Sequence, residues 1–135
     1  MSTKEAIAAA VVSGAVLLVG AAPLHGHHSF AVQYDAAKPI EITGTVTRIE
    51  WTNPHVHFYI DVPVEPGKIE HWNFEMASPN VLTRNGWRRD TLRVGSTVTV
   101  AGYLAKHGER MAIAGALTGA DGKPLFEPPQ QDPIR

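Results

Sequence analysis

The sequence contains no cysteine, so neither disulfide bonds nor thiolate metal ligands are available to it. A lipid anchor on an N-terminal cysteine is excluded for the same reason. The chain also has no excess of positive charge, because 12 Lys and Arg stand against 13 Asp and Glu, a formal net charge of -1. We therefore predict that it does not bind nucleic acid, which favours a basic protein surface. Any metal site must use imidazole, carboxylate or backbone donors, and seven histidines supply the first.

No complete catalytic motif is present. Gly-x-Ser-x-Gly, HExxH and phosphate-binding loops are missing, and Ser29 and Ser78 lack the context of an activated nucleophile. Asp35, Asp61 and Glu75 are candidates for acid–base chemistry, but scattered carboxylates are expected in any soluble chain. We therefore predict a binding protein and not an enzyme.

Only one long hydrophobic run occurs, over residues 6–22, after a short charged start. It is shorter than the roughly 20 residues that span a bilayer, and small residues follow it, which is typical of a secretory signal peptide. We predict a signal peptide within residues 1–26, cleaved between residues 21 and 26, and a periplasmic mature protein with no stable membrane insertion. An uncleaved membrane anchor is the alternative.

Alternation of apolar and polar residues predicts one mainly β domain over residues 27–126 and a flexible Pro-rich tail over 127–135. The predicted strands cover Ile40–Trp51, His55–Val62, Glu70–Met76, a stretch after Ser96 that ends near Leu104, and Met111–Leu117.

Two local signals refine this picture. A shift in the apolar phase beside Gly44 predicts a bulge or sharp bend in the first strand. Ser78-Pro79 and Gly86 predict a short helix over Pro79–Asn85. A small five-stranded OB-like barrel with one short helix between strands three and four fits best, and a small antiparallel sandwich or open roll is the alternative.

The polar face of the second and third strands carries the most informative pattern. If the two strands form a hairpin about Pro66, this face gathers His55, His57, Tyr59 and Asp61 with His71, Asn73 and Glu75. Two histidines at positions i and i+2 lie about 6–7 Å apart along a strand, so both imidazoles can converge on one metal or one anionic ligand. The expected register brings Glu75 near His57 and Asp61 near His71, as carboxylates beside metal-binding imidazoles often are. Solvated polar surface is the alternative interpretation.

A second histidine cluster, His25, His27 and His28, lies near the expected mature start. Short histidine-rich tracts favour Cu(II), Zn(II) and Ni(II). Cleavage after Gly26 would give His27 a free amine that chelates copper together with its ring. The alternative is an incidental tail.

Several motifs resemble a bacterial family of small exported proteins of unknown function. They include His27-His28-Ser29-Phe30-Ala31, Tyr34-Asp35 and Glu50-Trp51-Thr52-Asn53-Pro54-His55, and the likeness extends to about Phe126. The resemblance implies a periplasmic protein that starts near the paired histidines. It implies no activity, cofactor or catalytic residue.

The leading hypothesis is therefore a module that binds a transition metal, with copper favoured, through His27, His28, His55 and His57. Its predicted neighbours are His71, Glu75, Asp61 and Tyr59. A metal-independent domain that binds a protein or a small solute is the alternative. We predict that Trp51, Trp72 and Trp87 serve packing, although Trp87, which precedes Arg88-Arg89, is also a candidate aromatic platform for a ligand.

Overall fold

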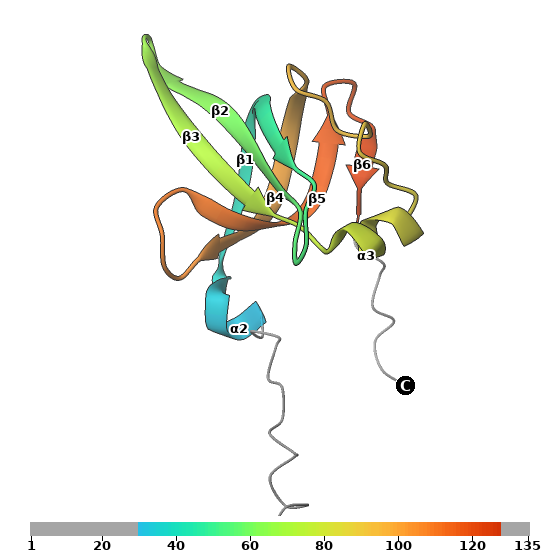
Figure 1. The fold of residues 1–135 in the computed structure, drawn as a ribbon. Coiled ribbons are helices and arrows are strands. Elements are labelled where there is room, and N and C mark those ends of the chain that lie inside the picture. Colours follow the sequence, from blue (N-terminus) through green and yellow to red (C-terminus); the bar gives the residue numbers. More distant parts are fainter. Residues whose placement is uncertain (1–29, 128–135) are drawn as a thin grey trace, which may run out of the picture.

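The computed structural model describes residues 30–127. The predicted signal peptide, its cleavage site, His25, His27, His28 and most of the predicted tail lie outside these residues. The described chain is mainly β, as predicted (Figure 1). Its elements are α2 (Phe30–Gln33), β1 (Tyr34–Glu50), β2 (His57–Glu65), β3 (Lys68–Glu75), α3 (Pro79–Arg84), β4 (Thr97–Ala105), β5 (Met111–Gly119) and β6 (Pro124–Phe126).

Five of the strands close into a ring. The antiparallel order β3-β2-β1-β4-β5 is completed by a parallel pairing of β3 with β5, from Asn73↔Met111 to Glu75↔Ile113. This is the connectivity of an OB-like barrel, which the sequence pattern favoured. Within residues 30–127, no helix is long and apolar enough to cross a membrane.

The first strand is long because it serves both halves of the ring. Its early residues pair with β4 and its last ones, Thr45–Glu50, pair with β2. A register shift between Val46 and Arg48 confirms the predicted bulge. A Cβ on Gly44 would lie 2.6 Å from the backbone oxygen of Asp61, so a glycine is required for the close approach of the two strands.

The structure adds elements that the apolar pattern did not predict. β1 begins at Tyr34 and not at Ile40, because Tyr34 pairs with Ala105 across a second register shift. A sixth strand, β6, pairs with Leu117 and Thr118 of β5, after a turn in which Gly122 has a φ of 76°. The partly buried side chains of Leu125 and Phe126 pack against the core and hold this short strand in place.

The predicted helix between strands three and four is present as α3. The Ser78 side chain accepts a hydrogen bond from the Val81 amide at its start, and Gly86, with a φ of 86°, follows its end. Leu82 is its buried residue and belongs to the core.

The core lies inside the ring and takes alternate residues of each strand. Phe58 of β2 and Phe74 of β3 stack there at a centroid distance of 5.3 Å. Ile60, two residues after Phe58 in β2, is also fully buried. Because these apolar residues point inward, the intervening polar residues of β2 and β3 lie on the outer face of the barrel.

Candidate functional site

The polar face predicted for β2 and β3 exists on the outside of the barrel. The strands pair with His57 opposite Glu75, Tyr59 opposite Asn73, and Asp61 opposite His71. The predicted register is therefore confirmed. Just before the start of β2, backbone hydrogen bonds join Val56 to Met76 and Ala77 and continue the pairing, which keeps His55 on the same face as His57.

Glu75 is the central residue of this face. Its exposed fraction is 7%, and it is the only buried polar or charged residue among residues 30–127. Its Oε2 atom accepts a hydrogen bond from the Tyr34 hydroxyl, and its Oε1 atom lies 2.5 Å from His55 Nδ1. A buried carboxylate needs such partners, because an unpaired one would lose its hydration without compensation.

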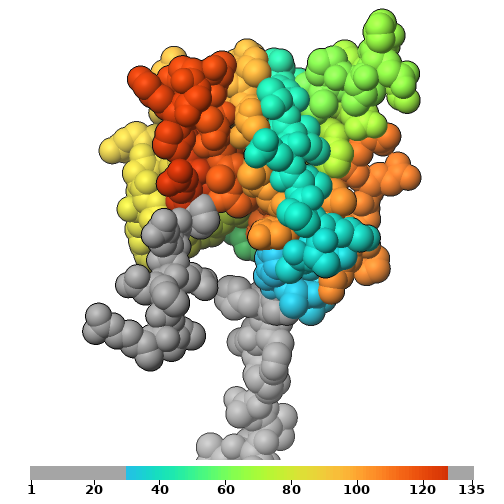
Figure 2. Space-filling view, turned by 180° about the vertical axis from the view of Figure 1, so that it is seen from behind, coloured from blue at the N-terminus to red at the C-terminus, as the bar shows by residue number. Residues whose placement is uncertain are grey.

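Tyr34 reaches Glu75 because α2 and the start of β1 fold against the barrel (Figure 2). The Phe30 ring lies 5.8 Å from the Tyr34 ring and meets Tyr103 edge-on at 5.7 Å. The Lys106 amide, directly after β4, donates to the Gln33 carbonyl at 2.8 Å and so connects the end of α2 to the end of β4. Burial, followed by the contact with Glu75, raises the pKa of Tyr34 far above its ordinary value, so its hydroxyl stays protonated and donates at neutral pH.

His57 is held in a similar way by the neighbouring strand. Its Nδ1 atom lies 3.0 Å from Asn73 Oδ1. Each of the two histidines thus has Nδ1 beside an acceptor oxygen of β3, from Glu75 or Asn73. Among the residues that the structure describes, none hydrogen-bonds to the Nε2 atom of either imidazole. The His55 side chain is 44% exposed, so solvent reaches it.

The other predicted neighbours form separate contacts. His71 Nδ1 lies 2.6 Å from Asp61 Oδ1, nearer the turn of the hairpin. Asp61 stands four residues from His57, about 13 Å along an extended strand. Tyr59 donates to Glu50 Oε2 at 3.1 Å and carries Arg48 3.8 Å above its ring. The structure therefore groups His55, His57 and Glu75, and it places His71, Asp61 and Tyr59 in other pairs.

The described residues do not complete a metal site by themselves. Over residues 30–127, no group of three or more His, Cys, Asp and Glu side chains could hold a metal ion. Near Glu75 only His55 and His57 supply imidazoles among residues 30–127, and both carboxylate oxygens of Glu75 already have partners. His27 and His28, the other two predicted ligands, lie outside the described part of the chain.

Two residues of this site were not assigned a role from the sequence. The sequence shows Tyr34 only as part of the Tyr34-Asp35 motif, and Asn73 only as a member of the predicted polar face. The resemblance motifs contained a usable signal, because Tyr34 comes from one motif and His55 from another, and both contact Glu75.

The tryptophans serve packing, as predicted. Trp87 is 4% exposed, donates from Nε1 to the Leu125 carbonyl at 2.9 Å, and meets the Phe126 ring edge-on at 5.7 Å. Trp51 and Trp72 are partly buried and pack against the core.

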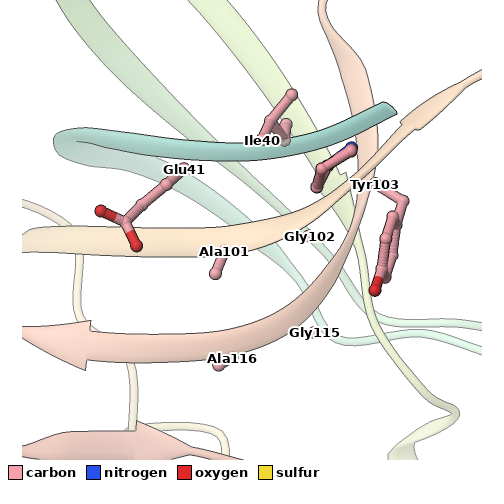
Figure 3. Close-up of a pocket in the computed structure, with 8 residues that line it drawn as sticks. Ile40, Glu41, Ala101, Gly102, Tyr103, Gly115 and Ala116 are labelled. Carbon is pink, nitrogen blue, oxygen red and sulfur yellow. The ribbon is translucent and has the colours of Figure 1, made fainter. Parts of the chain in front are cut away.

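A hollow of about 610 Å³ lies elsewhere, over β1, β4 and β5 (Figure 3). Its lining is largely small or apolar and consists of Pro39, Ile40, Glu41, Ala101, Gly102, Tyr103, Gly115 and Ala116. None of the predicted site residues lines it.

Comparison with known proteins places the chain in a family. Residues 14–114 match the Family of unknown function (DUF6152), and the chain belongs to that family. No curated protein matches it. Among solved structures, one crystal form of Rim1, a mitochondrial single-stranded DNA binding protein from S. cerevisiae, has a TM-score of 0.48 at 10% identity and covers 62% of this chain and 93% of that one. Another form of Rim1 has a TM-score of 0.47 at 15% identity, with 62% and 92% covered. Similarity at this level carries no inference about what this chain binds.

Proposed function

We propose that this protein is an exported, periplasmic, non-enzymatic module that binds a transition metal, with copper favoured, through His27, His28, His55 and His57. One observation carries the proposal: His55 and His57 share a face, and the Nδ1 atom of each lies within 3.0 Å of a side-chain oxygen of β3. Histidines that bind metals usually have their second ring nitrogen fixed in this way, which sets the tautomer and the ring orientation. Nε2 of each ring is then the ligand atom.

The donor set supports copper among the divalent metals. The chain has no cysteine, and neutral imidazole suits Cu(II), for which nitrogen sites have the highest affinity in the first-row series. Two imidazoles make an incomplete site, so the proposal requires His27 and His28. These stand three and two residues before Phe30, respectively. The Phe30 ring packs on Tyr34, the tyrosine that donates to Glu75.

Export is part of the same proposal. The apolar run over residues 6–22 supports a signal peptide, and a cut after Gly26 would leave His27 with a free amine. Mass spectrometry of the secreted protein should identify the first residue and any bound metal in one measurement.

Titration of the natively processed protein with Cu(II), by isothermal calorimetry, tests the site. His28→Ala/His57→Ala should weaken binding by at least about tenfold, because it removes one ligand from each cluster. His71→Ala is the matched control, since this imidazole lies on the same face of the hairpin and is paired with Asp61 instead. Equal affinity of the double variant and the unchanged protein would refute the proposal.

A metal-independent domain for a protein or small solute is the second candidate. The incomplete ligand set of residues 30–127 favours it. It predicts the same unfolding midpoint with and without a chelator, and a partner trapped by cross-linking in the periplasm. Both candidates predict no binding of single-stranded DNA, which a fluorescently labelled oligonucleotide would check.

A further inference from the structure

The segment from the last residue of α3 toward β4 concentrates positive charge. Four of the 12 Lys and Arg residues of the chain lie within ten positions, against a single carboxylate, that of Asp90. They are Arg84, Arg88, Arg89 and Arg93, and all four are exposed. Over residues 30–127, no carboxylate lies within salt-bridge distance of any of them, whereas Arg48 and Arg110 both have acidic partners. Within the described residues, no carboxylate neutralises these four guanidinium groups, and Arg93 Nε donates to the Asp90 backbone carbonyl at 3.3 Å.

Two of the four line a hollow with aromatic walls. The hollow measures about 350 Å³ and is lined by Trp51, Thr83, Trp87, Arg88, Arg89 and Asp90. Its size falls in the range of small-molecule sites, which combine apolar walls with a few polar groups. None of the residues of the polar face of β2 and β3 lines it.

The backbone that carries these arginines is well fixed. Trp87 is buried and anchored to the Leu125 carbonyl. Directly after it, the Arg88 amide donates to Thr91 Oγ1 at 2.8 Å, and the Thr91 amide donates to the Arg88 carbonyl at 3.1 Å. A turn that is already ordered reduces the conformational entropy lost on binding.

We propose that this hollow binds a small, soluble organic anion that carries one phosphate or carboxylate group on an apolar or planar body. A guanidinium group binds such oxyanions through paired N–H donors, and two adjacent arginines can share one oxyanion. The indole of Trp51 offers an apolar wall for the body of the ligand. Asp90 also lines the hollow, so its carboxylate and the two arginines together leave one net positive charge, which suits a ligand with one oxyanion group better than a polyanion.

The proposal is tested with phenyl phosphate as the probe, in metal-free protein at constant ionic strength. Titration followed by ¹H–¹⁵N NMR should give saturable shifts of the Trp51 indole and of the Arg88 and Arg89 signals. Phenol, which has the ring without the oxyanion, should give none.

Two variants of equal charge separate a site from a diffuse patch. Arg88→Gln/Arg89→Gln should weaken phenyl phosphate binding by about tenfold, because it removes charge-assisted hydrogen bonds. Arg84→Gln/Arg93→Gln removes the same charge from the same segment but outside the hollow, and it should change affinity by less than about twofold. Unchanged backbone spectra of both variants confirm folding.

Three results would overturn the proposal. Shifts that rise linearly without saturation would exclude a site, and equal losses in the two double variants would show charge attraction alone. The protein could also fail to bind phenyl phosphate and yet sediment with phosphatidylglycerol vesicles but not with phosphatidylcholine vesicles. That result would show that the arginines bind a lipid surface and not a soluble ligand.

Discussion

We predict that the buried contact between Tyr34 and Glu75 contributes to the free energy of unfolding. Tyr34→Phe keeps the ring that packs against Phe30 and removes only the hydroxyl that donates to Glu75. A hydrogen bond to a charged group contributes roughly 1.5–3 kcal/mol, and its loss leaves part of a buried carboxylate without a partner. We therefore expect Tyr34→Phe to lower the free energy of unfolding at neutral pH by about 1.5–3 kcal/mol.

Urea unfolding followed by tryptophan fluorescence measures this difference. Tyr103→Phe is the matched control, because Tyr103 is 37% exposed and its hydroxyl has no hydrogen-bond partner within residues 30–127. We expect the control to change stability by less than about 0.5 kcal/mol. If Tyr34→Phe is as stable as Tyr103→Phe, the contact with Glu75 does not stabilise the fold and the reasoning is wrong.

The pH dependence provides an independent check on the same contact. Burial and Glu75 raise the pKa of Tyr34 above the ordinary value of 10.0, so above that pH the unfolded chain releases a proton that the folded protein keeps. The contribution of Tyr34 is complete below pH 10 and is lost as the pH rises toward the higher folded pKa, by up to about 1.4 kcal/mol per pH unit. Tyr34→Phe should therefore lose stability less steeply than the unchanged protein between about pH 10 and 11. Parallel slopes would show that Tyr34 titrates in the folded protein as it does in the unfolded chain.

Two further predictions concern the fold. Gly44→Ala should lower the free energy of unfolding in urea by about 1–3 kcal/mol, because its Cβ would lie 2.6 Å from the Asp61 backbone oxygen. Gly115→Ala should lower it less, because the nearest atom to its Cβ would be 3.4 Å away. A larger loss in Gly115→Ala than in Gly44→Ala would contradict the close approach of β1 and β2. Ser78→Ala should cost about 1 kcal/mol in the same assay through loss of the cap of α3, while Ser78→Asp should preserve stability; equal losses in both would argue against capping.

Much of the fold could be predicted because its signals are local. The alternation in β2 and β3 depends only on which residues face the core, and a hairpin turn then fixes their register, so His57 and Glu75 were correctly placed opposite each other. The cap at Ser78 and the shift beside Gly44 are equally local. β6 was missed because a three-residue strand has too short a pattern to detect.

The contacts of the site could be predicted only in part. Tyr34 is 41 residues from Glu75 in the sequence, and the two meet because β3 and β5 close the ring and α2 folds against its outer face. No local sequence pattern near Tyr34 predicts that the ring closes in this way. Register alone also does not decide which neighbour a side chain contacts: His57 lies opposite Glu75 but turns to Asn73, and Glu75 takes His55 instead.

The arrangement around Glu75 limits how a metal site on this face can be built. One carboxylate oxygen is beside His55 and the other accepts from Tyr34, so both oxygens of Glu75 already have partners within the protein. Its role under the proposed function is therefore to orient His55 and strengthen it as a ligand, as carboxylates behind metal-binding histidines do. The same carboxylate holds Tyr34, which follows α2 and the paired histidines in the sequence. Under the proposed function, Glu75 would therefore connect the start of the described chain, at Tyr34, to the strand face that carries His55 and His57.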